Sequence, residues 1–264
     1  MKVVRCKSLP QNSWEEEAPL FKRDALLLIG HGSIVLPDAA RPILAHAEII
    51  RESRHFAEVK VGMLLGQPDV VSTFNEISSP VVHVVPFFLE DGYFTRIAIP
   101  DLLLSIASNP RVIRFCQPIG SHDGIASVIE ARLIRHCDMY GIDRKSLSVL
   151  LVGHGSARNA GRARCVRKHA ATLESGGRFG WVRVAYLEEP PVVAEALASA
   201  RGHVVAVIGY LANEGAHATN DVPALIAAER VMRGSHWPPV YDLGTIAADE
   251  AMPRLIMDLV VAAK

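Results

Sequence analysis

The sequence predicts an α/β protein built from two similar halves, each a parallel sheet with helices on both faces. Three observations predict this class. A motif early in the chain returns in the second half, short runs rich in β-branched apolar residues recur, and segments with helical periodicity lie between those runs. Alternating strands and helices favour right-handed crossover units, in which ligands bind at the carboxyl ends of the strands.

The repeat is exact enough to align the halves. Leu28-Ile29-Gly30-His31-Gly32-Ser33 returns 123 positions later as Leu151-Val152-Gly153-His154-Gly155-Ser156, and the same shift aligns the chain without a gap as far as Pro100 over Pro223. We therefore divide the chain into an N-terminal extension (1–23), a first half (24–144) and a second half (145–264), with the polar turn Tyr140–Lys145 at the boundary. Each half is large enough to bury a core of its own.

The elements follow in order along each half. Apolar runs predict six buried strands, at Ala25–Ile29, Val59–Leu65, Val81–Val85, Val149–Val152, Val182–Leu187 and Val204–Ile208. Helical periodicity predicts helices at Ile43–Glu52, Ile125–Cys137, Ala163–Leu173, Val192–Ala200, Val222–Met232 and Ala247–Val261. Tyr241–Thr245 leads into the last of these helices.

Composition narrows the possible functions. The formal net charge is zero, which gives no global field for nucleic acid, and half of the residues are hydrophobic without any run long enough to cross a membrane. The first twenty residues lack the apolar core of a signal peptide. The cysteines, Cys6, Cys116, Cys137 and Cys165, form no paired motif, which indicates reduced thiols. We expect a cytoplasmic protein.

Chemistry-bearing residues gather at three predicted strand ends of the second half. His154 follows one strand, Glu188 and Glu189 follow the next, and His217 follows the third. Each alone has an ordinary explanation, such as a turn histidine or an acidic residue at a helix N-terminus. Together, two imidazoles and a carboxylate at one sheet edge suit a divalent transition metal with open positions. Asp221 either orients His217 or caps the following helix.

The first half lacks three of these four polar residues. The residues that align with Glu188, His217 and Asp221 are Leu65, Phe94 and Ala98, while His31 remains opposite His154. Since the fold tolerates apolar residues at these positions, it does not require the polar ones of the second half.

Five positive charges follow the second motif with no acid among them: Arg158, Arg162, Arg164, Arg167 and Lys168. They form either a solvated helix face or a clamp for a ligand with several carboxylates, for which arginine is geometrically suited. Ser156 and His31 could also face such a ligand.

At these residues the sequence resembles the class II tetrapyrrole chelatases, which include the sirohydrochlorin cobaltochelatases and ferrochelatases of cobalamin and sirohaem synthesis. The resemblance runs from about Ala25 to the C-terminus. It rests on Gly-His-Gly-Ser, on the corner Leu187-Glu188-Glu189-Pro190-Pro191, and on Gly215-Ala216-His217 followed by Asn220-Asp221-Val222-Pro223, which is the most specific of the three.

The resemblance implies two flavodoxin-like three-layer domains around a macrocycle, with the metal held by histidines and a glutamate. His154, Glu188 and His217 match that pattern, so the first half is expected to be degenerate and the second to carry the site. We expect insertion of Co²⁺ or Fe²⁺ into sirohydrochlorin, with Ni²⁺ as a further candidate ion, and without an organic cofactor. Ser156, Arg158, Arg162, His31 and Asp221 are the candidate substrate-binding residues.

Two other readings compete with the enzyme. A tetrapyrrole carrier or metal chaperone would use the same pocket without turnover. A Rossmann-like or periplasmic-binding-like protein would share only the fold, and no G-x-G-x-x-G fingerprint follows the first strand. The chain is expected to be a monomer or a homodimer, since an internal duplication can replace a dimer of single halves.

Overall fold

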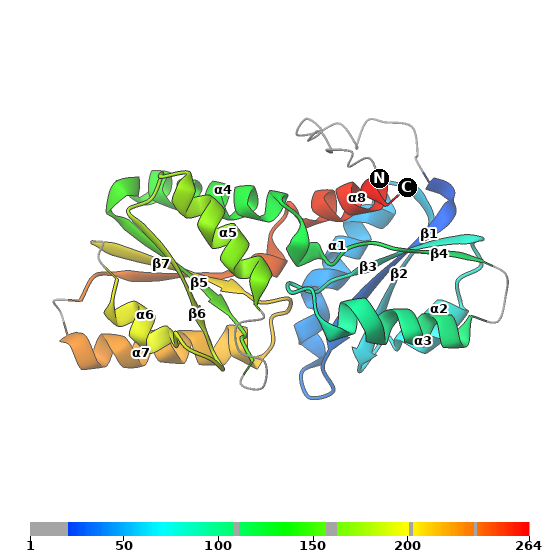
Figure 1. Ribbon diagram of the computed structural model, residues 1–264, viewed down its shortest axis with the longest axis horizontal. Helices are drawn as coiled ribbons and strands as arrows, with labels where there is room; N and C mark the ends of the chain where they lie inside the picture. Colours follow the sequence, from blue (N-terminus) through cyan, green and yellow to red (C-terminus); the bar gives the residue numbers. More distant parts are fainter. Residues whose placement is uncertain (1–20, 108–110, 157–162, 201–202, 235–236, 264) are drawn as a thin grey trace.

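Two four-stranded parallel sheets, one in each half, form the framework of the protein (Figure 1). The computed structural model describes residues 21–107, 111–156, 163–200, 203–234 and 237–263. The strand order is β2-β1-β3-β4 in the first sheet and β6-β5-β7-β8 in the second, so the two halves share one topology. The predicted α/β fold with two parallel sheets flanked by helices is confirmed.

The first sheet consists of β1 (Phe21–Gly32), β2 (Phe56–Leu65), β3 (Val81–Pro86) and β4 (Val112–Phe115). Its helices are α1 (Arg41–Glu52), α2 (Val70–Asn75), α3 (Ile99–Ile106) and α4 (Gly124–Tyr140), with short turns at η1 (Pro37–Ala40), η2 (Phe94–Ala98) and η3 (Ile119–Ser121). Residues of β1 from Ala25 to Ile29 are fully buried, as expected for a central parallel strand covered on both faces.

The second sheet consists of β5 (Leu147–Gly153), β6 (Trp181–Tyr186), β7 (Val204–Tyr210) and β8 (Val240–Thr245). Its helices are α5 (Arg164–Ser175), α6 (Val193–Ala198), α7 (Val222–Arg233) and α8 (Met252–Ala262), with short turns at η4 (Arg144–Ser146), η5 (His217–Asp221) and η7 (Ile246–Ala248). The predicted boundary near residue 144 falls in η4, between α4 and β5.

Local sequence signals set several helix ends. Pro42, Pro100, Pro223 and Pro253 each stand in the first turn of a helix, where the missing N–H would have no intrahelical partner. Helix α4 ends at Gly141, whose φ of 63° is left-handed, and the Ile142 N–H then donates to the Cys137 carbonyl.

The last helix of each half packs on the other half. Helix α4 follows the first sheet in sequence but lies against α5, and α8 follows the second sheet but lies against α1 (Figure 1). The largest buried cluster accordingly joins residues of both halves, such as Leu28, Ile129, Leu151 and Ile256. Each half therefore has a core of its own only on the outer face of its sheet. Helices α2 and α3 cover this face in the first half, and α6 and α7 cover it in the second.

One buried histidine from each half forms a hydrogen bond with the other half. His46 on α1 contacts the Ala247 carbonyl of the second half at 2.7 Å, and His169 on α5 contacts the Gly120 carbonyl of the first half at 2.8 Å. Burial lowers the pKa of both imidazoles. Neutral histidines that donate a hydrogen bond thus hold the two halves together.

The described cysteines, Cys116, Cys137 and Cys165, are buried and unpaired, as the sequence indicates. Burial raises the pKa of Cys116 to about 12 and that of Cys165 to about 11, so these thiols are poor nucleophiles. No helix in the described part of the chain is both long enough and apolar enough to cross a bilayer.

Candidate metal site at the edge of the second sheet

The site lies where three neighbouring strands of the second sheet end. His154 follows the last residue of β5, Glu188 lies just beyond β6, and His217 opens η5 after β7. Strand β5 lies between β6 and β7 in the sheet, so the three side chains start from adjacent strands at one edge.

A tight turn holds His154 beside Glu188. Gly155 has a left-handed φ of 74°, and a Cβ there would lie 2.8 Å from side-chain atoms of Tyr186 and Glu189, so only glycine fits. The Glu188 N–H donates to the His154 carbonyl at 3.0 Å, which fixes the two residues side by side.

Burial separates the two candidate carboxylates. The Glu188 side chain is 46% exposed, while Glu189 is 4% exposed and packs beneath the glycine turn. Glu188 is therefore the carboxylate that faces the histidines.

A π-turn presents His217. Residues His217–Asp221 form η5, and its wider spacing brings the His217 Nδ1 within 2.6 Å of the Asp221 Oδ2. Such π-turns within helices are frequent at functional sites. A carboxylate acceptor at Nδ1 places the ring proton there and leaves the Nε2 lone pair for a metal. No side-chain capping bond is made by Asp221 to the helix that follows, so of its two predicted roles the structure shows the contact with His217.

The three side chains converge. One ligand atom each from His154, Glu188 and His217 lie within 4.8 Å of one another, so among the residues that the structure describes these three form a group that could hold a metal ion. The imidazole rings stand 4.7 Å apart at 89°, and the His154 Nδ1 lies 3.7 Å from the Glu188 Oε2. We call these residues the metal trio.

The metal trio is open to solvent. The side chains of His154, Glu188 and His217 are 48%, 46% and 45% exposed. Three nitrogen and oxygen donors on one side of an ion leave its other positions to water or a second ligand. The arrangement therefore suits an ion that is taken up and passed on.

The other predicted site residues fall into three groups. Arg158 and Arg162 lie outside the described residues. Ser156 is partly buried just after His154; its twin Ser33 accepts a hydrogen bond from the Leu36 N–H at 3.0 Å, a turn-forming role. His31 is exposed at the equivalent edge of the first sheet, with its Nδ1 3.1 Å from the Gly32 carbonyl.

Two of the five basic residues that follow His154 make contacts within the protein. Lys168 pairs with Asp123, which precedes α4, and the Arg167 Nη1 lies 3.4 Å from the Tyr186 hydroxyl. These two cations on α5 therefore contribute contacts to the fold.

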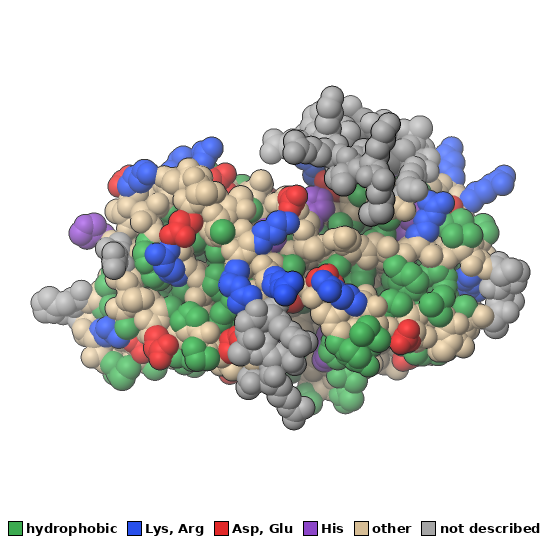
Figure 2. Space-filling model, viewed as in Figure 1, with side chains coloured by type: hydrophobic (Ala, Val, Ile, Leu, Met, Phe, Trp, Pro, Cys, Tyr) green, Lys and Arg blue, Asp and Glu red, His purple; other side chains and the backbone are tan. Residues whose placement is uncertain are grey.

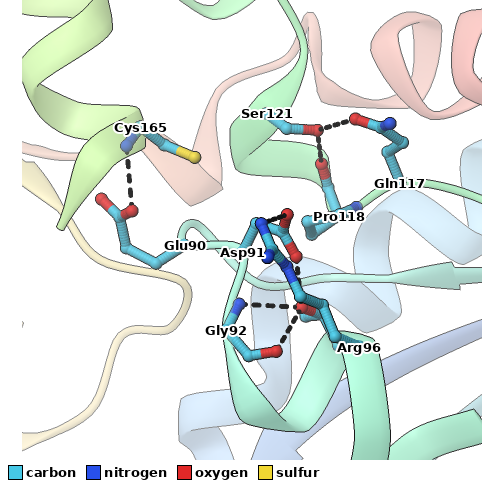
Figure 3. Close-up of polar contacts among 9 residues, drawn as sticks. Glu90, Asp91, Gly92, Arg96, Gln117, Pro118, Ser121 and Cys165 are labelled. Atoms are coloured by element: carbon cyan, nitrogen blue, oxygen red, sulfur yellow. Dashed lines mark hydrogen bonds and ion pairs between the residues drawn. The ribbon is translucent and has the colours of Figure 1, made fainter. Parts of the chain in front are cut away.

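Sequence reasoning missed a carboxylate that joins the two halves. Glu90, from the loop after β3, accepts hydrogen bonds from the N–H groups of Cys165 (Figure 3) and Val166 at 2.9 and 3.1 Å, at the start of α5. Burial raises its pKa even though these N–H groups favour the charged form. The same loop is braced by Asp91, which binds Arg96 and Thr95.

The reciprocal contact lies next to His217. Glu214, three residues before His217, accepts from the Arg41 Nε at 3.0 Å at the start of α1. Each half thus uses the loop after its third strand to hold the first helix of the other half. The pair of adjacent polar residues at this position in both halves, Glu90-Asp91 and Asn213-Glu214, was the available sequence signal.

Comparison with known proteins identifies relatives over most of the chain. The CbiX family model matches residues 25–136 and again residues 148–258. A probable sirohydrochlorin cobaltochelatase of Halobacterium salinarum is 29% identical over 222 residues, covering 75% of each chain.

Solved structures agree on the fold. SirB from Bacillus subtilis, solved with Fe³⁺, superposes with a TM-score of 0.75 at 21% identity, covering 91% of this chain and 95% of SirB. A multi-domain protein of Deinococcus radiodurans with structural similarity to chelatases gives a TM-score of 0.76 at 25% identity over 91% of this chain, and this chain spans 55% of that protein. The two-fold match of the family model shows that the chain belongs to the CbiX family of class II chelatases, in its two-half form.

Proposed function

We propose that the protein inserts a divalent metal ion, Co²⁺ or Fe²⁺, into sirohydrochlorin, with the metal trio of the second half as the working site. The observation that carries the proposal is the convergence of His154, Glu188 and His217 within 4.8 Å at an open sheet edge. Membership of the CbiX family supplies the class of reaction.

Metal insertion requires a protein that binds the metal ion loosely and groups that accept the ring protons. A divalent ion that enters a free-base macrocycle exchanges its ligands for ring nitrogens, and two ring N–H protons leave, so charge balances. His154 and His217 bind and deliver the ion, Glu188 assists ligation and accepts one ring proton, and the other ring proton passes to solvent. Asp221 orients His217 through the bond to Nδ1.

The macrocycle is expected to carry carboxylates that basic side chains can hold. Arg158, Arg162, Ser156 and His31 are the proposed contacts with it, and no organic cofactor is required. Sirohydrochlorin is preferred because the named relative is a probable sirohydrochlorin cobaltochelatase. The trio does not distinguish cobalt from iron or nickel, because all three accept imidazole and carboxylate ligands.

The test is a chelation assay. Purified protein is incubated with excess sirohydrochlorin and Co²⁺, Fe²⁺ or Ni²⁺ in parallel, and the absorption spectrum is followed against a reaction without protein. We expect many turnovers per protein molecule with Co²⁺ or Fe²⁺. Binding of one sirohydrochlorin per protein with no increase in the rate of metal insertion would instead indicate a carrier.

A further inference from the structure

The loop that carries His217 is held by the other half of the protein. It runs from the end of β7 at Tyr210 to η5, which His217 opens. On the way, the Glu214 carboxylate accepts from the Arg41 Nε at 3.0 Å, and the Glu214 N–H donates to the Ala39 carbonyl at 3.4 Å. Because Arg41 and Ala39 belong to α1 and η1, the first half supplies both contacts.

Backbone hydrogen bonds carry this support on to His217. The Gly215 carbonyl, next to Glu214, accepts from the N–H groups of Ala218 and Thr219 at 2.9 and 3.1 Å. In sequence, His217 lies between the residues that these bonds join. A displacement of Glu214 therefore displaces the backbone of His217 as well.

The matching acid of the first half is paired within its own loop. Asp91 aligns with Glu214, and its Oδ2 accepts from the Arg96 Nη2 at 2.6 Å (Figure 3). In the second half the position of Arg96 is taken by Thr219, which carries no charge. The second half thus obtains from the other half the cation that the first half supplies locally.

The ion pair between Arg41 and Glu214 is too exposed to serve mainly for stability. The Arg41 side chain is 76% exposed and that of Glu214 is 25% exposed. Figure 2 shows other charged side chains at the surface in the centre of the molecule, where the two halves of Figure 1 meet. Solvent screens such pairs, so they contribute little to the free energy of folding. The buried contacts of His46 and His169 already join the halves, which leaves the position of the loop as the role of this pair.

We propose that Arg41 is a positioning residue of the metal trio. It holds Glu214 across the boundary between the halves and so keeps His217 beside the other two metal ligands. The first half lacks two of the three ligands at its own sheet edge, yet its first helix completes the site of the second half. This inference rests on the proposed function, from which it takes the trio as the metal-binding site.

The test measures Co²⁺ affinity in the absence of sirohydrochlorin. Metal-free protein competes for Co²⁺ with a chromophoric chelator. Arg41→Ala should raise the Kd about threefold, because the coupling cannot exceed the free energy of the exposed ion pair, about 1 kcal/mol or about fivefold. Arg41→Lys keeps the charge and should restore most of the affinity. The matched control, Lys168→Ala, breaks another exposed ion pair between the halves, with Asp123, and should bind Co²⁺ like the original protein.

A second comparison shows whether Arg41 acts through Glu214 and His217. Glu214→Gln should lose as much Co²⁺ affinity as Arg41→Ala, and the double variant should lose no more than either. In a His217→Ala background the positioned ligand is gone, so Arg41→Ala should leave the already weakened Kd unchanged. An arginine that only stabilised the fold would weaken Co²⁺ binding equally in both backgrounds.

A Kd for Arg41→Ala equal to that of the original protein would overturn the inference, and so would an equal further loss in the His217→Ala background. If the original protein binds Co²⁺ through His217 but does not insert it into sirohydrochlorin, the proposed function fails, and these Kd values still decide the inference. If His217→Ala binds Co²⁺ as tightly as the original protein, the trio is not the metal site and both fail.

Discussion

Replacing Asp221 tests how the protein prepares His217 for a metal ion. The 2.6 Å contact between the His217 Nδ1 and the Asp221 Oδ2 is a charge-assisted hydrogen bond. Loss of such a partner behind a metal-ligating histidine typically costs about 10–100-fold in metal affinity. The two side chains are 45% and 50% exposed, so solvent screens the pair and the lower end applies.

We therefore expect Asp221→Ala to weaken Co²⁺ binding about tenfold, which is about 1.4 kcal/mol. Asp221→Asn keeps an acceptor without its charge, and because a neutral hydrogen bond is about half as strong as a charged one, the loss should be about threefold. The assay is competition for Co²⁺ between the metal-free protein and a chromophoric chelator.

The matched control is Asp138→Asn, which removes the charge of an exposed acid paired with Arg144, away from the trio. It should bind Co²⁺ like the original protein. The reasoning is refuted if Asp221→Ala retains full Co²⁺ affinity, or if Asp221→Asn loses as much as Asp221→Ala.

Three further predictions follow from the halves and their junction. Leu65→Glu combined with Phe94→His should create a second trio with His31 and raise the Co²⁺ stoichiometry from one to two in a calorimetric titration. Glu90→Ala leaves two N–H groups of α5 without their acceptor and should lower the free energy of unfolding by about 2 kcal/mol in urea denaturation. Burial lowers the pKa of His46 and His169 in the folded protein, so the unfolded chain binds more protons and Tm should fall as pH drops below about 6.5, the ordinary histidine pKa.

Each of these has its own control. Adding His31→Ala to the double variant should return the stoichiometry to one, and a second ion that persists would show that it binds elsewhere. Glu76→Ala removes an exposed ion pair with Lys60 and should change the unfolding free energy by less than about 1 kcal/mol. Replacing His46 and His169 by glutamine should flatten the acid side of the Tm profile, and an unchanged slope would place the titrating groups elsewhere.

The apolar patterns in the sequence were sufficient to predict the central strands and the edge strands β2 and β6, but not the edge strand β4. Strand β4 was missed because it is an edge strand with partly exposed residues such as Val112 and Arg114, so it lacks a continuous apolar run. The exchange of α4 and α8 was also missed. An apolar helix face shows that a partner exists, but not which half supplies it.

The candidate site could be predicted from the sequence because the carboxyl ends of neighbouring parallel strands lie at one edge of the sheet. That rule brought His154, Glu188 and His217 to one place, and the duplicated half identified which positions the fold leaves free. The choice between Glu188 and Glu189 required the burial of each side chain. For Glu90 the sequence offered only the polar pair Glu90-Asp91, which does not reveal the role of Glu90, because its partners are backbone N–H groups that any helix N-terminus offers.

The most direct test of a working site in the second half compares two histidines that share one motif. The rate of Co²⁺ insertion into sirohydrochlorin is measured for His217→Ala and for His31→Ala beside the original protein. The account predicts a severe loss in His217→Ala and a mild one in His31→Ala. Equal losses in the two variants, or retained activity in His217→Ala, would contradict it.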